Sequence, residues 1–276
     1  MSEGVNDWRP RPLVVETDDT HGGRWTSLRT PEREWLWRNP AVPAAARAAV
    51  RPGDAFVDAG GVEECFPTLR GAPDHGDVWS RLWTSAEPGC ASVRTGSLSL
   101  RRSLSVQDGA VVATYDVTGP PGAPVLYAVH ALLDLSPAAR LLVPGAPPVS
   151  VLDQPAPGEV ARTTWPDGAG VTLDALGPDD GTARCAVVTT DRLDVLDGTD
   201  RLTLRWQVVR GTGPVSLVVW RNLRGWPQAA PYRSVGVEPL LGATADLATA
   251  GPGETGVLDA GGRLTWRLTL TAHREG

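Results

Sequence analysis

The chain has 276 residues, of which 41% are hydrophobic, and its formal net charge is −6. The hydrophobic content is that of a globular protein and argues against a disordered chain. The negative net charge argues against a nucleic-acid-binding protein, and no run of about 18 apolar residues predicts a membrane span.

Glycine and proline are abundant, at 31 and 25 residues, which predicts many turns and therefore many short strands. The three cysteines, Cys65, Cys90 and Cys185, form neither a spaced pair nor a metal-ligand cluster. An odd cysteine count fits a reducing compartment, and the first residues lack the apolar core of a signal peptide. We therefore expect a cytoplasmic protein without a metal site.

Strand-like runs recur along the whole chain, and only residues 43–50 look helical. The runs at 202–208 and 264–270 alternate cleanly between apolar and polar residues, as half-buried antiparallel strands do. The alternation of strands and helices that marks a parallel sheet is absent. These features predict an all-β protein, one large antiparallel β-sandwich that forms a single domain over residues 1–276. The expected strands are 54–58, 97–106, 111–117, 125–135, 140–143, 170–173, 186–190, 202–209, 215–220 and 264–272.

Residues 60–83 gather acids, an imidazole, a guanidinium and flat aromatic faces in one short segment. A segment that only filled a core would contain fewer polar and turn-forming residues. Such side chains are what a sugar-binding cleft requires, since aromatic faces stack on sugar rings and polar groups bind hydroxyls. The residues that we single out here are Glu63, Glu64, Asp74, His75, Asp77, Trp79, Arg81 and Trp83.

Two further titratable residues lie in apolar surroundings. His130 occurs within the apolar run 125–135, where a histidine is either a satisfied core residue or an imidazole that faces a cleft and titrates near neutral pH. Glu238 follows a short apolar run and precedes Pro239, which favours extended backbone. Its carboxylate is either a solvated acid at a strand end or a group with a reason to carry a raised pKa. The other two histidines, His21 and His273, are expected at the surface.

A second aromatic segment, 218–227, contains Trp220, Arg221, Asn222, Arg224 and Trp226. The tryptophans could stack on a pyranose while the polar side chains bind its hydroxyls, although several of the 11 tryptophans of the chain must serve packing. The sequence contains no GxSxG, P-loop, HExxH or dinucleotide-binding motif. What remains is acid–base chemistry without a bound cofactor.

Taken together, these segments resemble the aldose 1-epimerase (galactose mutarotase-like) family. His130 matches the second histidine of that family, on a central strand. The remaining matches follow the order of the family along nearly the whole chain: GGRWTSL at 22–28, REWLWRNP at 33–40, GGVEECFPT at 60–68, DHGDVWSRLW at 74–83 and VEPLLG at 237–242.

The resemblance implies a β-supersandwich that interconverts the α and β anomers of a sugar. Glu238 would be the general base for the anomeric hydroxyl, His130 the acid that protonates the ring oxygen, and His75 a group that positions the substrate. The expected partner is thus a small-molecule sugar, with no nucleic acid, membrane or cofactor; the oligomeric state is left open. Residues expected to bind the sugar are Glu64, Asp77, Trp79, Arg81, Trp220 and Asn222.

Two alternatives remain open from the sequence. One is a non-catalytic sugar-binding or sensor protein with the same fold. The other is a hexose-phosphate epimerase, in which arginines would hold the phosphate. The early substrate arginine of the family has no evident match, and Arg70 or Arg81 could replace it. The arginines available for a phosphate are Arg70, Arg81, Arg221 and Arg224.

Overall fold

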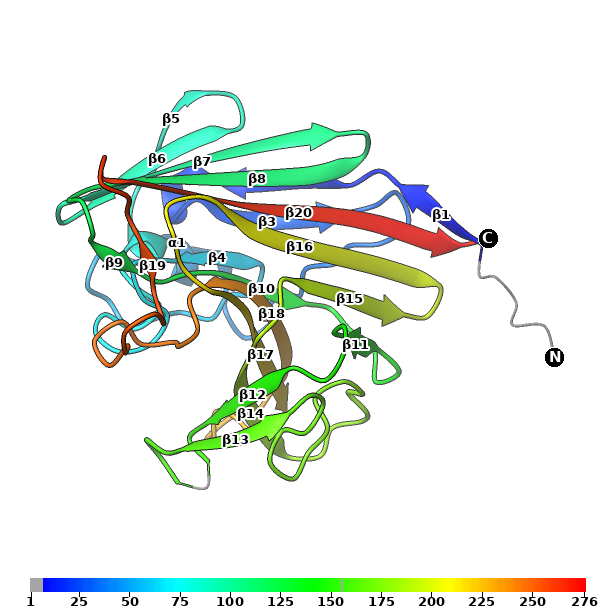
Figure 1. Cartoon of the computed structure of the whole chain (residues 1–276). Helices are drawn as coiled ribbons and strands as arrows, with labels where there is room; N and C mark the ends of the chain where they lie inside the picture. The colour runs from blue at the N-terminus through cyan, green and yellow to red at the C-terminus, as the bar shows by residue number, and fades with distance from the viewer. Residues whose placement is uncertain (1–6, 155) are drawn as a thin grey trace.

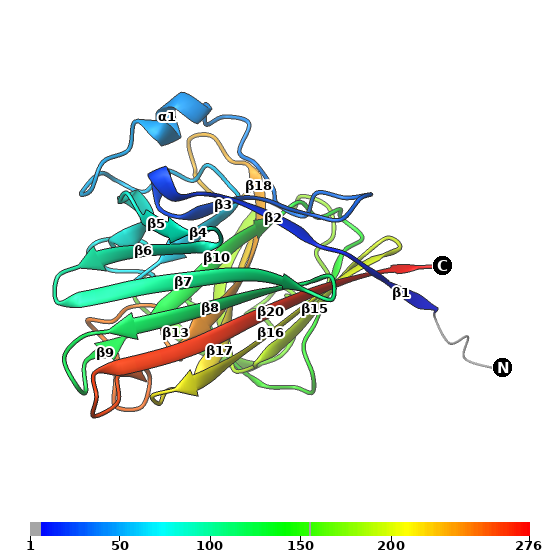
Figure 2. The same ribbon diagram turned by 90° about the horizontal axis from the view of Figure 1, so that it is seen from above.

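Two large antiparallel sheets pack against each other in the computed structural model, which describes residues 7–154 and 156–276 (Figure 1). Figure 2 shows the long strands of one sheet side by side, the strands of the other sheet behind them, and the short helix α1 (Ala44–Ala48) apart at one edge. The predicted all-β antiparallel sandwich is therefore confirmed.

The first sheet, here called sheet 1, has nine strands in the order β11-β15-β16-β20-β8-β7-β6-β5, with β1 paired to β20. A two-residue turn joins β7 to β8, and both of its residues, Asp108 and Gly109, have positive φ, as such a hairpin requires. The strands are β1 (Trp8–Arg11), β5 (Thr84–Glu87), β6 (Cys90–Thr95), β7 (Leu98–Gln107), β8 (Ala110–Thr118), β11 (Arg140–Leu142), β15 (Arg192–Asp197), β16 (Asp200–Arg210) and β20 (Arg263–Glu275).

The second sheet, here called sheet 2, also has nine strands, in the order β13-β12-β14-β17-β18-β10-β4-β3-β2. Two short strands, β9 (Pro124–Val125) and β19 (Gly256–Val257), form a separate ribbon, and 3₁₀ turns occupy Asp19–His21 and Val78–Ser80. The strands of sheet 2 are β2 (Val14–Asp18), β3 (Arg24–Arg29), β4 (Val62–Cys65), β10 (Tyr127–Leu133), β12 (Pro148–Leu152), β13 (Val160–Thr164), β14 (Thr182–Val188), β17 (Val215–Leu223) and β18 (Arg233–Leu241).

The two sheets differ in how their strands are buried. In sheet 1, β8 and β20 alternate between buried and more exposed residues, so one face packs on the core and the other meets water. In sheet 2, every residue of β10 is buried, and so is every residue of β18 after its first. Both faces of sheet 2 are therefore covered at its central strands. Sheet 1 covers one face, and long connections between strands cover the other.

The hydrophobic core lies between the sheets, and its largest cluster includes residues from Leu13 to Ala272. The expectation of a single domain over residues 1–276 stays a prediction. Among the residues that the structure describes, no helix has the length and apolarity needed to cross a membrane.

Most predicted strands overlap observed ones, and the predicted helix at 43–50 is α1. Two predictions were wrong. Residues 54–58 form an irregular segment without ladder partners, and residues 170–173 lie in a turn held by one isolated bridge between Asp167 and Thr172. Strand β18 was not predicted as a full strand, because Gly236 and Pro239 lie within it and both residues are rare in strands.

Candidate active site

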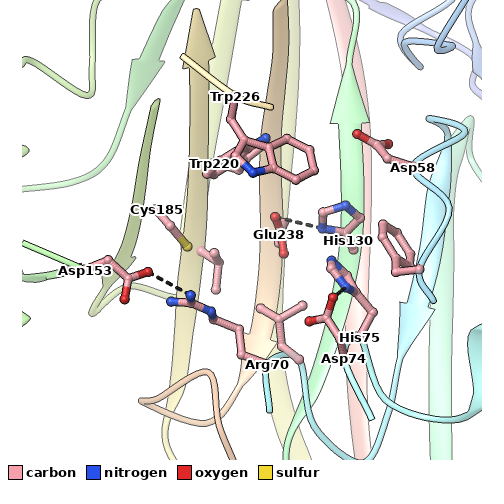
Figure 3. Close-up of a pocket in the computed structure, with 13 residues that line it drawn as sticks. Asp58, Arg70, Asp74, His75, His130, Asp153, Cys185, Trp220, Trp226 and Glu238 are labelled. Atoms are coloured by element: carbon pink, nitrogen blue, oxygen red, sulfur yellow. Dashed lines mark hydrogen bonds and ion pairs between the residues drawn. The ribbon is translucent and has the colours of Figure 1, made fainter. Parts of the chain in front are cut away.

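A cavity of about 310 Å³ opens on the face of sheet 2 that points away from sheet 1 (Figure 3). Its size lies near the lower end of the range for small-molecule sites, roughly 300–1,000 Å³. Side chains from β10, β14, β17 and β18 form its floor, and the connections between strands form its walls. The lining residues are Phe56, Asp58, Leu69, Arg70, Asp74, His75, His130, Asp153, Cys185, Val218, Trp220, Trp226 and Glu238.

His130 and Glu238 form an ion pair in the middle of this cavity. The register of β10 on β18 pairs Ala128 with Leu240 and Leu132 with Gly236, which brings His130 opposite Glu238. Nδ1 of His130 lies 2.9 Å from Oε1 of Glu238, and the two residues are only 7% and 2% exposed. The antiparallel pairing of two central strands thus brings together residues that are distant in sequence.

Gly236 makes the space that the Glu238 carboxylate occupies. A Cβ atom at this position would lie 2.8 Å from Oε1 of Glu238 and 3.0 Å from Cβ of Trp220. The other carboxylate oxygen, Oε2, is buried and has no hydrogen-bond partner among the described residues. A buried acceptor without a partner costs free energy, so a ligand hydroxyl that bonded Oε2 would be stabilised there.

The charge of Glu238 determines the protonation of His130. Burial by itself would lower the pKa of the imidazole, but the charge and hydrogen bonding of Glu238, assisted by Asp58 and Glu63, raise the pKa to about 9. His130 is therefore protonated at neutral pH. Because Nδ1 faces Glu238, Nε2 is the nitrogen left to donate a proton to a ligand.

His75 lies beside this pair, on the connection after β4. Its ring stacks on Phe56 with 3.6 Å between centroids and meets the His130 ring edge-on at 5.1 Å. Nδ1 lies 3.1 Å from Oδ2 of Asp74. Burial would raise the pKa of Asp74, but the hydrogen bond and charge of His75 lower it. The structure therefore brings together all three residues that the sequence analysis took as catalytic.

Trp220 and Asn222, on β17, have different positions. Trp220 lines the cavity, and its Nε1 donates a hydrogen bond of 3.1 Å to Oγ of Ser234. Asn222 is fully buried and does not line the cavity. Its Oδ1 accepts hydrogen bonds of 3.0 Å from the backbone N–H groups of Gly225 and Trp226, and its Nδ2 donates one of 2.9 Å to the Trp226 carbonyl. Asn222 thus holds the loop that carries Trp226.

The other residues expected to bind the sugar lie away from the cavity. Glu64 is fully buried among partners from both sheets, and Trp79 is 1% exposed and packs edge-on beneath Phe56 at 4.9 Å. Asp77 and Arg81 form an ion pair with each other, with 2.7 Å between Nη2 and Oδ2. The positions of these four residues and of Asn222 therefore give no support to a direct role in binding. None of the five lines the cavity, and Trp79 packs against the lining residue Phe56 from outside it.

Of the two arginines considered as substitutes for the early substrate arginine, only Arg70 lines the cavity. Its Nη2 donates a hydrogen bond of 2.7 Å to Oδ2 of Asp153, near the edge of the site opposite Trp220 in Figure 3. Cys185 also lines the cavity, but burial raises the pKa of its thiol to about 12. The thiol is therefore neutral near pH 7 and is not a nucleophile.

Phe56 and Asp58 were not predicted as site residues, because their segment resembles a strand in sequence. Both line the cavity from the irregular segment after α1. Asp58 accepts a hydrogen bond of 2.6 Å from the Tyr232 hydroxyl. A weak signal existed, since Phe56 is one of only two phenylalanines and precedes the Gly60-Gly61 pair.

No protein-family model and no curated protein matches the chain. Solved structures do match, although their sequences are only 12–14% identical to this one.

A candidate aldose 1-epimerase from Escherichia coli K12 has a TM-score of 0.68 and 14% identity, over 97% of this chain and 99% of that chain. A galactose mutarotase related enzyme from Lactobacillus acidophilus has a TM-score of 0.67 and 13% identity, over 96% of both chains. A candidate aldose 1-epimerase from Klebsiella pneumoniae has a TM-score of 0.70 and 12% identity, over 96% of this chain and 77% of that one. The chain therefore has the fold of the aldose 1-epimerases, the galactose mutarotase-like sandwich that its motifs resemble.

Proposed function

We propose that the chain is an aldose 1-epimerase-like enzyme that interconverts the α and β anomers of a sugar by general acid–base ring opening. The observation that carries this proposal is the pair of His130 and Glu238 inside an open cavity, with His75 beside it. The buried imidazolium of His130 supplies the acid, and the buried Glu238 carboxyl group, with one oxygen that has no partner among the described residues, supplies the base.

Ring opening requires one proton to leave the substrate and another to enter it. Oε2 of Glu238 accepts the proton of the anomeric hydroxyl, and Nε2 of His130 donates a proton to the ring oxygen. The bond between C1 and the ring oxygen then breaks, which leaves an open-chain aldehyde between a neutral carboxyl and a neutral imidazole. Rotation about C1–C2 presents the other face of the aldehyde, and the two protons return as the ring closes.

His75 supports the substrate rather than the proton transfers. Its ring stacks on Phe56 and meets the His130 ring edge-on, and its Nδ1 lies 3.1 Å from Asp74, so the imidazole is held at the cavity wall beside the acid. A hydrogen bond from His75 to a sugar hydroxyl would fix the ring between the acid and the base. Such positioning keeps the reacting atoms in register with both groups.

The arginines favour a sugar without a phosphate group. Arg221 is bound to Asp180, and Arg224 is bound to Asp179, each with 2.7 Å between the charged atoms. Arg81 is likewise paired with Asp77, which leaves Arg70 as the cavity arginine, and Arg70 is engaged by Asp153. Because Asp58, Asp74, Asp153 and Glu238 also line the cavity, a phosphate would meet more negative than positive charge.

The test is the rate of anomer interconversion, measured by NMR magnetisation exchange on a panel of free aldoses. We expect His130→Ala and Glu238→Gln each to lower the rate by about 10²–10⁴-fold, the usual contribution of one general acid or base. His273→Ala, at a histidine on β20 outside the cavity, is the control and should leave the rate unchanged. Wild-type rates in both site variants would refute the mechanism, and sugar binding without acceleration would favour a non-catalytic sugar-binding protein.

We also propose that this enzyme works in the cytoplasm. All three cysteines are free thiols, as expected in a reducing compartment. The small-molecule partner, and the absence of nucleic-acid and membrane partners, remain predictions.

A further inference from the structure

A row of four aromatic side chains leads out of the cavity. Trp220 and Trp226 line the cavity and meet edge-on, with 6.1 Å between ring centroids. Trp226 then meets Tyr232 edge-on at 6.0 Å, and Tyr232 stacks on Trp37 at 5.6 Å. Tyr232 and Trp37 do not line the cavity, so the aromatic row continues beyond it.

Trp226 is exposed and yet held in place. Its side chain is 47% exposed, which is unusual for so large an apolar group in this chain, where Trp25, Trp35, Trp79, Trp83 and Trp266 are all at most 2% exposed. The buried side chain of Asn222 makes hydrogen bonds to both the N–H and the carbonyl of Trp226. A fixed, exposed aromatic face binds a ligand at low cost in conformational entropy.

A polar group accompanies the row on the cavity side. Asp58 lines the cavity and accepts the hydrogen bond from Tyr232, while its other oxygen accepts one of 3.3 Å from the Gly60 N–H. Burial and Asp58 raise the pKa of Tyr232, so the tyrosine remains a hydroxyl donor. Aromatic faces with a carboxylate beside them match the apolar face and the hydroxyls of a pyranose ring.

The cavity cannot account for the whole row. Its volume of about 310 Å³ is near the lower limit for small-molecule sites, and His130 and Glu238 lie in its middle. A sugar whose anomeric carbon lies at His130 and Glu238 occupies the middle of the cavity. A ring linked to that sugar on the side of Trp226 would lie against Tyr232 and Trp37.

We propose that Trp226, Tyr232 and Trp37 form a second sugar subsite, so that the preferred ligand is a reducing disaccharide or a longer reducing oligosaccharide. Its reducing-end ring occupies the cavity, and the next ring stacks on the aromatic row. The orientation of the ligand rests on the proposed function, whereas the existence of the subsite does not.

The test is isothermal titration calorimetry of the full chain with matched pairs of sugars: glucose with maltose and with cellobiose, and galactose with β-1,4-galactobiose. We expect at least one disaccharide to bind about five- to tenfold more tightly than its monosaccharide, the effect of one aromatic stack. Trp37→Ala and Trp226→Ala should remove this advantage, Trp226→Phe should retain most of it, and Trp8→Ala, a tryptophan on β1 outside the row, should leave it intact.

Three outcomes would overturn the subsite. The first is that no disaccharide binds more tightly than its monosaccharide, and the second is that Trp37→Ala weakens both sugars equally. The third is that the row joins two copies of the chain, in which case Trp37→Ala would convert a dimer into a monomer in sedimentation without changing the disaccharide advantage. Because the readout is binding, a disaccharide advantage without mutarotation would refute the proposed function alone, and mutarotation without that advantage would refute the subsite alone.

Discussion

At the scale of the residue, His130 shows how a buried histidine can also line a cavity. The apolar strand suggested either a satisfied core residue or an imidazole facing a cleft. The residue is 7% exposed and still lines the cavity, because the covering connections leave an opening above β10. Burial strengthens its ion pair with Glu238, since both charges lie in surroundings of low dielectric constant.

This pair predicts an unusual titration. We expect the His130 imidazole to lose its proton near pH 9, and the rate of anomer interconversion to fall as the pH rises through that value. Because this pKa is above the value of about 6.5 for an unfolded histidine, the pair stabilises the folded chain fully below pH 6.5 and progressively less toward pH 9. The measurement is NMR of the imidazole ¹⁵N shifts across pH 5–10, assigned with His130→Asn.

Glu238→Gln is the control for that titration. It removes the charge that opposes the effect of burial, so the pKa of His130 should fall well below 9. A His130 signal that still titrated near pH 9 in Glu238→Gln would show that another group holds the proton.

At the scale of the element, the sequence predicted the strands whose residues alternate, but it also predicted a strand in a segment that has no ladder partner. The alternating run at 202–208 lies within β16, and that at 264–270 lies within β20. Residues 54–58 resemble a strand in composition but have no ladder partner. Two residues of this segment, Phe56 and Asp58, line the cavity instead. The residue pattern of a single segment does not show whether a neighbouring strand is present to pair with it.

Part of the site was predictable from motifs and from residue types. Trp220, which was expected to bind the sugar because of its aromatic face, lines the cavity. His75, His130 and Glu238 followed from the resemblance, and all three line the cavity. Glu64 was singled out for its charge, but its partners are strands far along the chain, and no window of sequence contains them. Asn222 was chosen for its amide, which binds the backbone of its own loop instead of the cavity.

The loop between β17 and β18 gives a prediction at this scale. Asn222→Ala removes hydrogen bonds from a buried side chain to Gly225 and Trp226, so these half-buried backbone groups lose their partners and the folded chain should lose about 1–3 kcal/mol of stability. Hydrogen exchange followed by mass spectrometry should show faster exchange in residues 224–228 and unchanged exchange in β10. Trp226→Ala removes only the side chain and should leave that exchange slow. Slow exchange in Asn222→Ala would mean that the loop keeps its shape by other contacts.

At the scale of the whole molecule, one buried carboxylate joins the two sheets. Glu64 extends from β4 of sheet 2, and its Oε1 accepts a hydrogen bond of 2.7 Å from Arg102 on β7 of sheet 1. The same carboxylate accepts hydrogen bonds from Trp25 Nε1 at 3.0 Å and from the Tyr127 hydroxyl at 2.7 Å. Burial, together with this carboxylate, raises the pKa of Tyr127 well above its usual value, so the tyrosine remains a donor.

The Glu64–Arg102 ion pair should therefore control the stability of the sandwich. Arg102→Met leaves the buried Glu64 carboxylate without its ion-pair partner and should lower the free energy of unfolding by about 3–5 kcal/mol. Glu64→Gln leaves Arg102 with Asp19, 3.3 Å away, as its remaining partner, so it should lower the free energy of unfolding by less. The double variant removes both charges and should lose clearly less than the two single losses combined. Urea unfolding followed by tryptophan fluorescence measures all three, and Arg101→Met, at an exposed arginine of β7 paired with Glu87, serves as the control. If the losses of the two single variants simply added in the double variant, Glu64 and Arg102 would stabilise the sheets independently rather than as a pair.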